Sequence, residues 1–233
     1  MPIKKFDSDL GVIKVSKRRN VKRISLTVAS GSIKVTQPFW LPYFHGYRFA
    51  LSNRVWISQQ LQSSFVFSLQ DGQQYGKRHV LQITQGGNLA CRIISNKIRL
   101  SVPEGVDINT QPVFDCFKKG LKRALKKEAT DFLPERVAII ANKYNLTYKK
   151  LAFKAMRSRW GSCNSKQNIS INTYLMLASW DAIDYVIAHE LAHTKYMHHK
   201  ADFWDLLRLI VPDYKNCQTN LKQLQKQISP LQF

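Results

Sequence analysis

The sequence of 233 residues is 44% hydrophobic and 11% aromatic, which excludes a disordered chain and allows a full hydrophobic core. No apolar run approaches the roughly 18 residues of a membrane-spanning helix and no signal peptide is recognisable, so we expect a soluble, cytoplasmic protein and no membrane partner. The net charge of +21 favours a polyanionic partner, either nucleic acid or nucleotide, although a basic surface that serves only solubility is an alternative.

Residues 10–36 are predicted to form strands. Apolar residues alternate with polar ones over residues 24–28 and again over residues 33–35, with a turn at Gly31 between them. The segment 17–23 contains five basic residues. It could grip phosphate, but such a run is more often a solvated strand edge that resists aggregation.

A helix is expected after these strands, over residues 47–61. The spacing of its apolar residues predicts that Phe49, Val55 and Trp56 face inward. A second strand-rich block follows over residues 65–102, where apolar and polar residues alternate again. The first hundred residues are therefore predicted to be mainly β-structure.

A polar and irregular segment at residues 103–112 marks the expected boundary between two parts of the chain. The first part, residues 1–108, is predicted to be β-rich with one helix. The second part, residues 109–233, is predicted to be helical and to carry the chemistry. We expect the two parts to form one integrated unit.

A long amphipathic helix is predicted at the start of the second part. Apolar residues recur at helical spacing from Phe114 to Phe132, and basic residues between Lys118 and Lys127 cover much of the remaining surface. This basic face could track a phosphate backbone, but a solvent-facing surface is the more common explanation. Pro134 is expected to break or restart the helix.

Two apolar alternating segments, residues 151–155 and 169–171, are predicted to pair as a hairpin. Their connection carries the Trp160-Gly161 pair. Two further helices are expected at the end of the chain, because apolar residues recur at helical spacing over residues 203–210 and 217–228.

His189, Glu190 and His193 form an H-E-x-x-H motif in a stretch that is apolar almost all round, which predicts a buried helix. Ser179 or Asp181 can cap this helix. On a helix, residues four apart lie on the same face, so the two histidines can present ring nitrogens to one metal ion. Glu190 is offset by one residue and can reach a metal-bound water without being a ligand.

The motif supplies two ligands, whereas a catalytic zinc ion usually has three protein ligands and one open position, so the third ligand must come from outside the motif. No glutamate follows Glu190, which leaves five candidates: His198, His199, Asp202, Asp205 and Asp213. His199 lies ten residues after His189, the spacing of the H-E-x-x-H-x-x-G-x-x-H pattern, although Tyr196 occupies the glycine position. The spacing favours His199, and His198 is then a residue at the rim of the site.

Four segments carry a resemblance to a known family. Three are S-R-W-G-S-C at residues 158–163, I-S-I-N at 169–172 and D-Y-V-I-A-H-E-L-A-H at 184–193. The fourth, R-R-N-V-K-R-I-S-L-T-V at 18–28, extends the similarity over nearly the whole chain. Together they resemble the YgjP-like metallopeptidase family, and the order and spacing of W-G-S-C and H-E-L-x-H are specific.

The resemblance implies an α+β fold in which a β-rich N-terminal half packs on a helical, zincin-like metallopeptidase half, related to SprT-like and WLM-type domains. It also implies a Zn²⁺ ion held by His189, His193 and His199. Glu190 would be the catalytic residue. The chain departs from the family at His198, where Asn is usual, which changes the rim of the site.

The function expected is zinc-dependent hydrolysis, with a peptide or protein as the favoured substrate. Glu190 would act as general base, taking a proton from the zinc-activated water and passing it to the leaving amine. Arg157 and Tyr196 are candidates for contacts with the substrate or with the developing oxyanion.

Two other functions stay open. One keeps the metal site but changes the substrate to a nucleoside triphosphate, since a bacterial member of the family is described as a uridine triphosphate pyrophosphatase. The imidazole-rich site argues against it, because phosphoryl transfer usually uses Mg²⁺ held by carboxylates. The other is a nucleic-acid-associated protein with a zinc site, against which Glu190 argues because a structural zinc needs no base.

Overall fold

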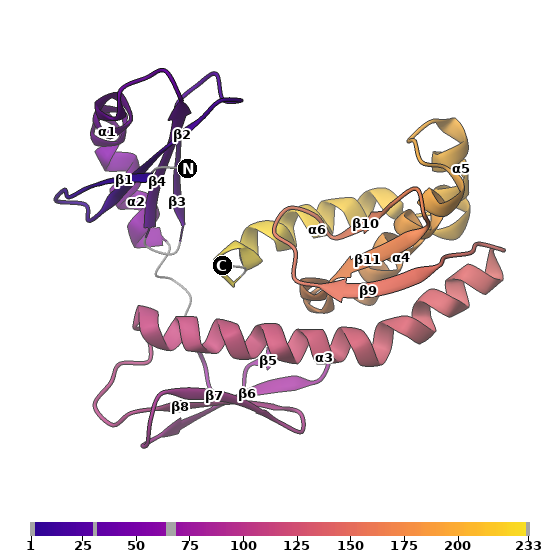
Figure 1. Ribbon diagram of the computed structural model, residues 1–233. Helices are drawn as coiled ribbons and strands as arrows, with labels where there is room; N and C mark the ends of the chain where they lie inside the picture. Colours follow the sequence, from indigo (N-terminus) through magenta and orange to yellow (C-terminus); the bar gives the residue numbers. More distant parts are fainter. Residues whose placement is uncertain (1–2, 30–31, 64–68, 232–233) are drawn as a thin grey trace. The chain divides into compact units, whose positions relative to one another are not determined.

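The structure is a computed structural model that describes residues 3–29, 32–63 and 69–231 (Figure 1). It has sheets in the N-terminal part and a helical C-terminal half, which confirms the predicted α+β class. The chain divides into two compact units, residues 1–68 and 69–232. Within the described ranges, no helix is both long enough and apolar enough to cross a membrane.

The first unit is a four-stranded sheet with two helices. Its strands, in the spatial order β1-β2-β4-β3, are β1 (Ile3–Phe6), β2 (Ile13–Arg18), β3 (Ser25–Ala29) and β4 (Ser32–Pro38). Its helices are α1 (Tyr43–Ser52) and α2 (Arg54–Ser63). The buried core consists of Ile13, Val15, Ile33, Val35, Ala50 and Ile57. The strands predicted within residues 10–36 are confirmed, whereas the turn expected at Gly31 lies outside the described residues.

The single helix predicted over residues 47–61 is two helices that meet at Asn53. The Asn53 side-chain amide donates a hydrogen bond to the Phe49 carbonyl at 2.8 Å, and this bond helps to end α1. Because α2 starts again from a new direction, Ile57 is buried, while Val55 and Trp56 are 67% and 42% exposed. The prediction that Val55 and Trp56 face inward is therefore wrong.

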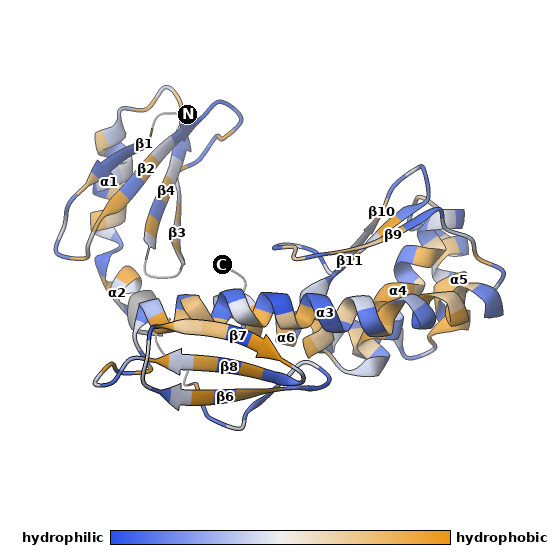
Figure 2. Ribbon diagram, turned by 60° about the horizontal axis from the view of Figure 1, so that its bottom comes forward, coloured by the Kyte–Doolittle hydropathy of each residue, from blue (hydrophilic) through white to orange (hydrophobic). Residues whose placement is uncertain are grey.

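The second unit begins with another four-stranded sheet that packs on a long helix. The strands, in the order β5-β6-β8-β7, are β5 (Gln74–Tyr75), β6 (His79–Gln85), β7 (Ala90–Ile94) and β8 (Lys97–Val102), and the helix is α3 (Gln111–Lys143). Figure 2 shows hydrophilic and hydrophobic bands alternating along α3, as the sequence predicted. The buried Phe117 ring of α3 lies 4.9 Å from the Tyr75 ring of β5.

This packing explains why the units divide after residue 68 and not at the expected boundary of 108/109. Strands β7 and β8 contact α3, so a boundary at 108/109 would separate a sheet from the helix that covers it. The described part of residues 1–108 also contains two helices, where one was expected. The predicted break at Pro134 is wrong, because α3 continues through it; the helix loses the hydrogen bond that a proline cannot donate but is held by its packing.

The C-terminal part contains a small sheet in the order β10-β11-β9. Its strands are β9 (Lys150–Lys154), β10 (Gly161–Cys163) and β11 (Asn168–Asn172). β9 and β11 run parallel, so the hairpin predicted for residues 151–155 and 169–171 is wrong. The tight turn lies instead at residues 164–167, between β10 and β11, and these two strands pair antiparallel. The Trp-Gly segment therefore leads into an edge strand and not a hairpin loop.

Helices complete this unit. A short 3₁₀ helix, η1 (Thr173–Leu177), leads from β11 into α4 (Trp180–Lys195), and α5 (Ala201–Ile210), α6 (Tyr214–Ile228) and the 3₁₀ turn η2 (Ser229–Leu231) follow. The last two α-helices confirm the predictions for residues 203–210 and 217–228. Helix α4 contacts α3, α5, α6, β10 and β11, so it is the central element of the C-terminal part.

Candidate metal centre

Helix α4 holds the H-E-x-x-H motif in a fixed orientation. Ser179 caps its N-terminus, with the Oγ atom accepting a hydrogen bond from the Ala182 backbone N–H at 3.4 Å. The Arg136 guanidinium of α3 donates two hydrogen bonds to the Asp184 carboxylate, one of them at 2.6 Å. A two-point contact between a guanidinium and a carboxylate restricts rotation as well as distance, so α4 is anchored to α3.

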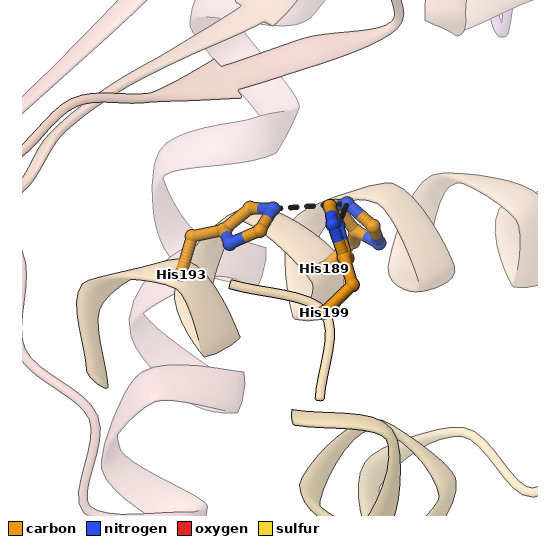
Figure 3. A group of neighbouring side chains, drawn as sticks. All are labelled: His189, His193 and His199. Atoms are coloured by element: carbon orange, nitrogen blue, oxygen red, sulfur yellow. Dashed lines mark hydrogen bonds between the residues drawn. The ribbon is translucent and has the colours of Figure 1, made fainter. Parts of the chain in front are cut away.

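Three histidine side chains converge near the C-terminal end of α4 (Figure 3). His189 and His193 project from the helix, and His199 comes from the segment between α4 and α5. The Nε2 atoms of His193 and His199 lie 3.2 and 3.3 Å from the Nε2 atom of His189. Nitrogens bound to a tetrahedral zinc ion at about 2.0–2.1 Å lie about 3.3 Å apart, so these two distances suit such an ion, and all three ligand nitrogens lie within 4.8 Å of one another.

The backbone around the motif orients two of these rings. His193 Nδ1 lies 3.0 Å from the Tyr196 carbonyl oxygen, and a proton on Nδ1 donated to that oxygen leaves the Nε2 lone pair for a metal. The Trp204 indole N–H donates to the His199 carbonyl at 3.0 Å, which holds the segment that carries the third ring. Local hydrogen bonds therefore orient the His193 ring and hold the backbone of His199, whereas the buried His189 Nδ1 atom has no hydrogen-bond partner among the described residues.

Phe203 forms the apolar floor of the histidine cluster. Its side chain is fully buried, and its ring centroid lies 5.0, 4.7 and 4.6 Å from those of His189, His193 and His199. An aromatic surface beneath three imidazoles keeps water away from one side of the cluster. It also limits the rotamers that the three rings can adopt.

Two of the imidazoles, those of His189 and His193, are held in the neutral state that metal binding needs. Burial lowers the pKa of His189 to about 4, and the neighbouring His193 and His199 rings add to the effect. Burial also lowers the pKa of His193, partly opposed by the hydrogen bond to the Tyr196 carbonyl. Neutral ring nitrogens can donate their lone pairs to a cation without first losing a proton.

Glu190 lies beside strand β10 and is only 5% exposed. Its Oε2 atom is buried without a hydrogen-bond partner in the part of the chain that the structure describes, so this oxygen is available to a water molecule or a substrate. Burial raises the pKa of Glu190 to about 7, against the opposing charge of Arg159. A carboxyl group with this pKa can accept a proton and release it again near neutral pH.

A pocket of about 230 Å³ adjoins Glu190 and His189. Arg159 and Tyr185 contribute to its lining. The Tyr185 hydroxyl accepts a hydrogen bond from the Gln218 side-chain amide at 3.0 Å, which leaves its own proton free to be donated elsewhere. The pocket thus combines a cationic group, a hydroxyl donor and the Glu190 carboxyl, and it can receive a polar substrate.

Asn172, at the end of β11, holds the loop that carries Arg159. The buried Asn172 amide donates hydrogen bonds to the Met156 and Arg159 carbonyls at 2.9 and 2.8 Å. Its Oδ1 atom accepts from the backbone N–H groups of Met156 and Tyr174, each at 3.2 Å. All of its polar capacity is used inside the protein, so Asn172 positions the loop and does not contact a substrate.

The other residues singled out from the sequence are placed differently. Arg157 and Arg159 are both exposed, but Arg159 is the arginine that lines the pocket and whose charge acts on Glu190. Tyr196 contributes its backbone carbonyl, while its ring lies 6.2 Å from the His198 ring. His198 is exposed, with Nδ1 3.6 Å from Asp202.

Neither His198 nor an aspartate belongs to the group of possible metal ligands found among the described residues. The residues that sequence reasoning missed are Arg159, Asn172, Tyr185 and Phe203. Three of them, Arg159, Asn172 and Tyr185, stand in the segments S-R-W-G-S-C, I-S-I-N and D-Y-V-I-A-H-E-L-A-H, so their position in a specific motif was a signal. Phe203 was predicted only as an apolar residue of a helix, at a spacing typical of a core.

Comparison with known proteins gives one finding that bears on this site. The family model described as YgjP-like, metallopeptidase domain, matches residues 22–224. The matched region includes the three histidines, Glu190 and the segment of Arg159. No curated protein and no solved structure matches the chain at a significant level.

Proposed function

Since the chain belongs to the family of YgjP-like metallopeptidase domains, which supports a metal-dependent hydrolase, we propose that it is a zinc-dependent peptidase. His189, His193 and His199 hold the ion in this proposal. The observation that carries it is the convergence of three ring nitrogens within 4.8 Å of one another, two of the distances being 3.2 and 3.3 Å, which are close to those around a tetrahedral zinc ion.

A zinc ion bound there would supply a lowered water pKa and polarise a scissile carbonyl. Glu190 is the general base that removes the proton from the attacking water and then delivers it to the leaving amine. Its raised pKa, near 7, supports both steps, because the group can take up and release a proton at neutral pH. Arg159 and Tyr185 are the residues best placed to bind the substrate near the reacting carbonyl, in the place of Arg157 and Tyr196.

Strand β10 is the element that suits an extended peptide. In the described sheet β10 pairs with β11 on one side only, whereas β11 has strands on both sides. A peptide that adds to the free edge of β10 would make main-chain hydrogen bonds and run past Gly161, next to Glu190. This geometry favours a peptide over a compact small molecule.

The alternative substrate, a nucleoside triphosphate, has one observation in its favour, the net charge of +21. The described group of possible metal ligands holds three imidazoles and no carboxylate, which is unlike the oxygen ligands that Mg²⁺ prefers for phosphoryl transfer. Assays of peptide hydrolysis and of triphosphate hydrolysis on the same protein decide between the two substrates.

The test uses the purified wild type, Glu190→Gln, and Glu135→Gln as a matched control at an exposed glutamate of α3. Bound metal is measured first, and then hydrolysis of an unfolded protein and of uridine triphosphate. We expect about one zinc per chain in all three proteins and a loss of proteolysis of about 100-fold or more only in Glu190→Gln. Triphosphate cleavage without proteolysis would refute the peptidase, and full activity of Glu190→Gln would refute the role of Glu190.

A further inference from the structure

The first unit has a charge pattern that the proposed peptidase does not explain. The unit has two acidic residues, Asp7 and Asp9, of which Asp9 pairs with Arg54 at 3.2 Å, and residues 10–68 contain no aspartate or glutamate. They contain nine basic residues: Lys14, Lys17, Arg18, Arg19, Lys22, Arg23, Lys34, Arg48 and Arg54. A surface that serves only solubility usually mixes both signs of charge, so this one-sided composition indicates an anionic partner for the unit itself.

The sheet topology brings two exposed segments of different chemistry to the same end of the sheet. β2 and β4 are parallel neighbours, and their last residues, Arg18 and Pro38, are paired in register. The chain continues from β2 into the basic segment 18–23 and from β4 into the aromatic segment 39–44. Because neighbouring parallel strands finish at the same end of a sheet, the two segments leave the sheet side by side.

The aromatic segment presents its rings to solvent and keeps cations beside them. Phe39, Trp40 and Phe44 are 52%, 56% and 55% exposed, and the Phe39 and Trp40 rings meet edge to face at 5.3 Å. Two cations lie over neighbouring rings, Lys17 at 4.6 Å from the Tyr43 ring and Arg48 at 5.9 Å from the Phe44 ring. We call residues 17–23 and 39–48 together the aromatic-basic rim.

We propose that the aromatic-basic rim binds single-stranded nucleic acid. Exposed rings offer stacking platforms for unpaired bases, and the cations beside them meet the phosphates that recur with every base. Duplex DNA fits less well, because its bases are already stacked and cannot reach the rings. A lipid surface also fits less well, since the one leucine of the aromatic segment, Leu41, is half-buried and the cations lie over ring faces.

The test is a binding titration with the full chain and a fluorescein-labelled oligothymidine of 20 nucleotides (dT20), about the span of one or two such sites. Anisotropy is measured at two salt concentrations. We expect the double variant Trp40→Ala/Phe44→Ala to weaken binding at least about 10-fold at both salt concentrations, since each of its two substitutions removes a ring on which a base can stack. Arg18→Ala/Arg19→Ala/Arg23→Ala should weaken binding and reduce the salt slope by about 2.

The matched control is Lys122→Ala/Lys126→Ala/Lys127→Ala, which removes three exposed cations from the basic face of α3 in the other unit. We expect it to change the dT20 affinity by less than about 3-fold, and thermal melting should show that all variants remain folded. Three results would each overturn the proposal: a larger loss from the α3 variant than from the rim variants, equal affinity for duplex DNA, or binding only to vesicles that contain phosphatidylserine.

Discussion

Gly161 of β10 lies so close to Glu190 of α4 that a Cβ atom at position 161 would come within 2.5 Å of the Glu190 Oε1 atom. It would also lie 2.6 and 2.8 Å from the Cγ and Cδ atoms of the same side chain. Real Cβ atoms do not tolerate such contacts, so any larger residue at position 161 must displace the carboxylate. The W-G-S-C motif thus has a physical meaning: glycine is needed because the carboxylate occupies the space of its missing side chain.

Gly161→Ala is expected to lower hydrolysis by about 10-fold or more while bound zinc is retained, because a displacement of about 1 Å at a reacting group can cost this much. It should also lower the melting temperature. The double variant Gly161→Ala/Glu190→Ala tests the cause, since removal of the carboxylate frees the space for the methyl group. If the alanine at 161 destabilised both backgrounds equally, the contact with Glu190 would not be the reason.

His199→Ala is expected to weaken zinc affinity by roughly 100-fold or more. Removal of a group that only hydrogen-bonds to a metal ligand already costs about 10–100-fold in affinity, and loss of the ligand itself should cost at least as much. His198→Ala is the matched control, since the adjacent His198 ring is exposed and lies outside the histidine cluster. Its zinc affinity should stay within a few-fold of the wild type. Competition with a fluorescent zinc chelator gives the zinc dissociation constants of both variants. A larger loss of affinity in His198→Ala than in His199→Ala would identify His198 as the third ligand.

The metal-free protein is expected to lose stability in mild acid through His189. Its pKa is about 4 in the folded chain against 6.5 as the ordinary value, so the unfolded chain binds more protons between these two pH values. The contribution is therefore complete above pH 6.5 and is lost as the pH falls toward 4, and it amounts to a few kcal/mol at most, at about 1.4 kcal/mol per pKa unit.

Urea unfolding of the chelator-treated protein checks this pH dependence. Glu190→Gln serves as the background, because the raised pKa of Glu190 acts with the opposite sign. Addition of His189→Gln should flatten the acid side of the stability curve. Two parallel curves would show that His189 does not titrate in the way that its burial implies.

Glu128 of α3 is expected to be essential for stability. Its fully buried carboxylate accepts hydrogen bonds from the backbone N–H groups of Lys77, Arg78 and His79 at 2.7, 3.0 and 3.2 Å, and lies 2.6 Å from His79 Nδ1. Glu128→Ala leaves these groups buried without an acceptor, which should cost roughly 3–5 kcal/mol. The exposed Glu135→Ala should stay within about 0.5 kcal/mol of the wild type in the same urea unfolding experiment.

Asn172→Asp is expected to separate positioning from folding. The carboxylate can still accept from the Met156 and Tyr174 N–H groups, but it cannot donate to the Met156 and Arg159 carbonyls. We expect a loss of roughly 2 kcal/mol and a raised KM, because the loop that carries Arg159 loses two of its fixed contacts. Asn172→Asp with an unchanged KM would show that this loop does not help to bind the substrate.

How much could be predicted from the sequence depends on how local the contact is. His189, Glu190 and His193 lie within one and a half turns of a helix, so the period of the helix alone fixes which of them share a face. Ser179 as the cap and the strand alternation over residues 24–28 are equally local. These predictions needed no knowledge of the fold.

The pairing of strands was beyond the sequence. Residues 151–155 and 169–171 have the apolar alternation of a strand pair, but alternation is the same for parallel and antiparallel neighbours. The turn at 164–167 and the position of β10 on the outer edge decided the direction. The course of α3 through Pro134 and the division of the chain after residue 68 were decided in the same way, by packing between distant segments.

The sequence by itself determined which residues are candidates for the chemistry and which of them face together on one helix, since these relations depend on covalent spacing. Only the tertiary structure decided that His199 joins the other two rings, that Phe203 lies beneath them, and that Gly161 and Arg159 stand beside Glu190. These contacts form between separate elements, and their free energy comes from burial of the whole C-terminal part, so a local pattern could favour His199 as a candidate but could not place these residues together.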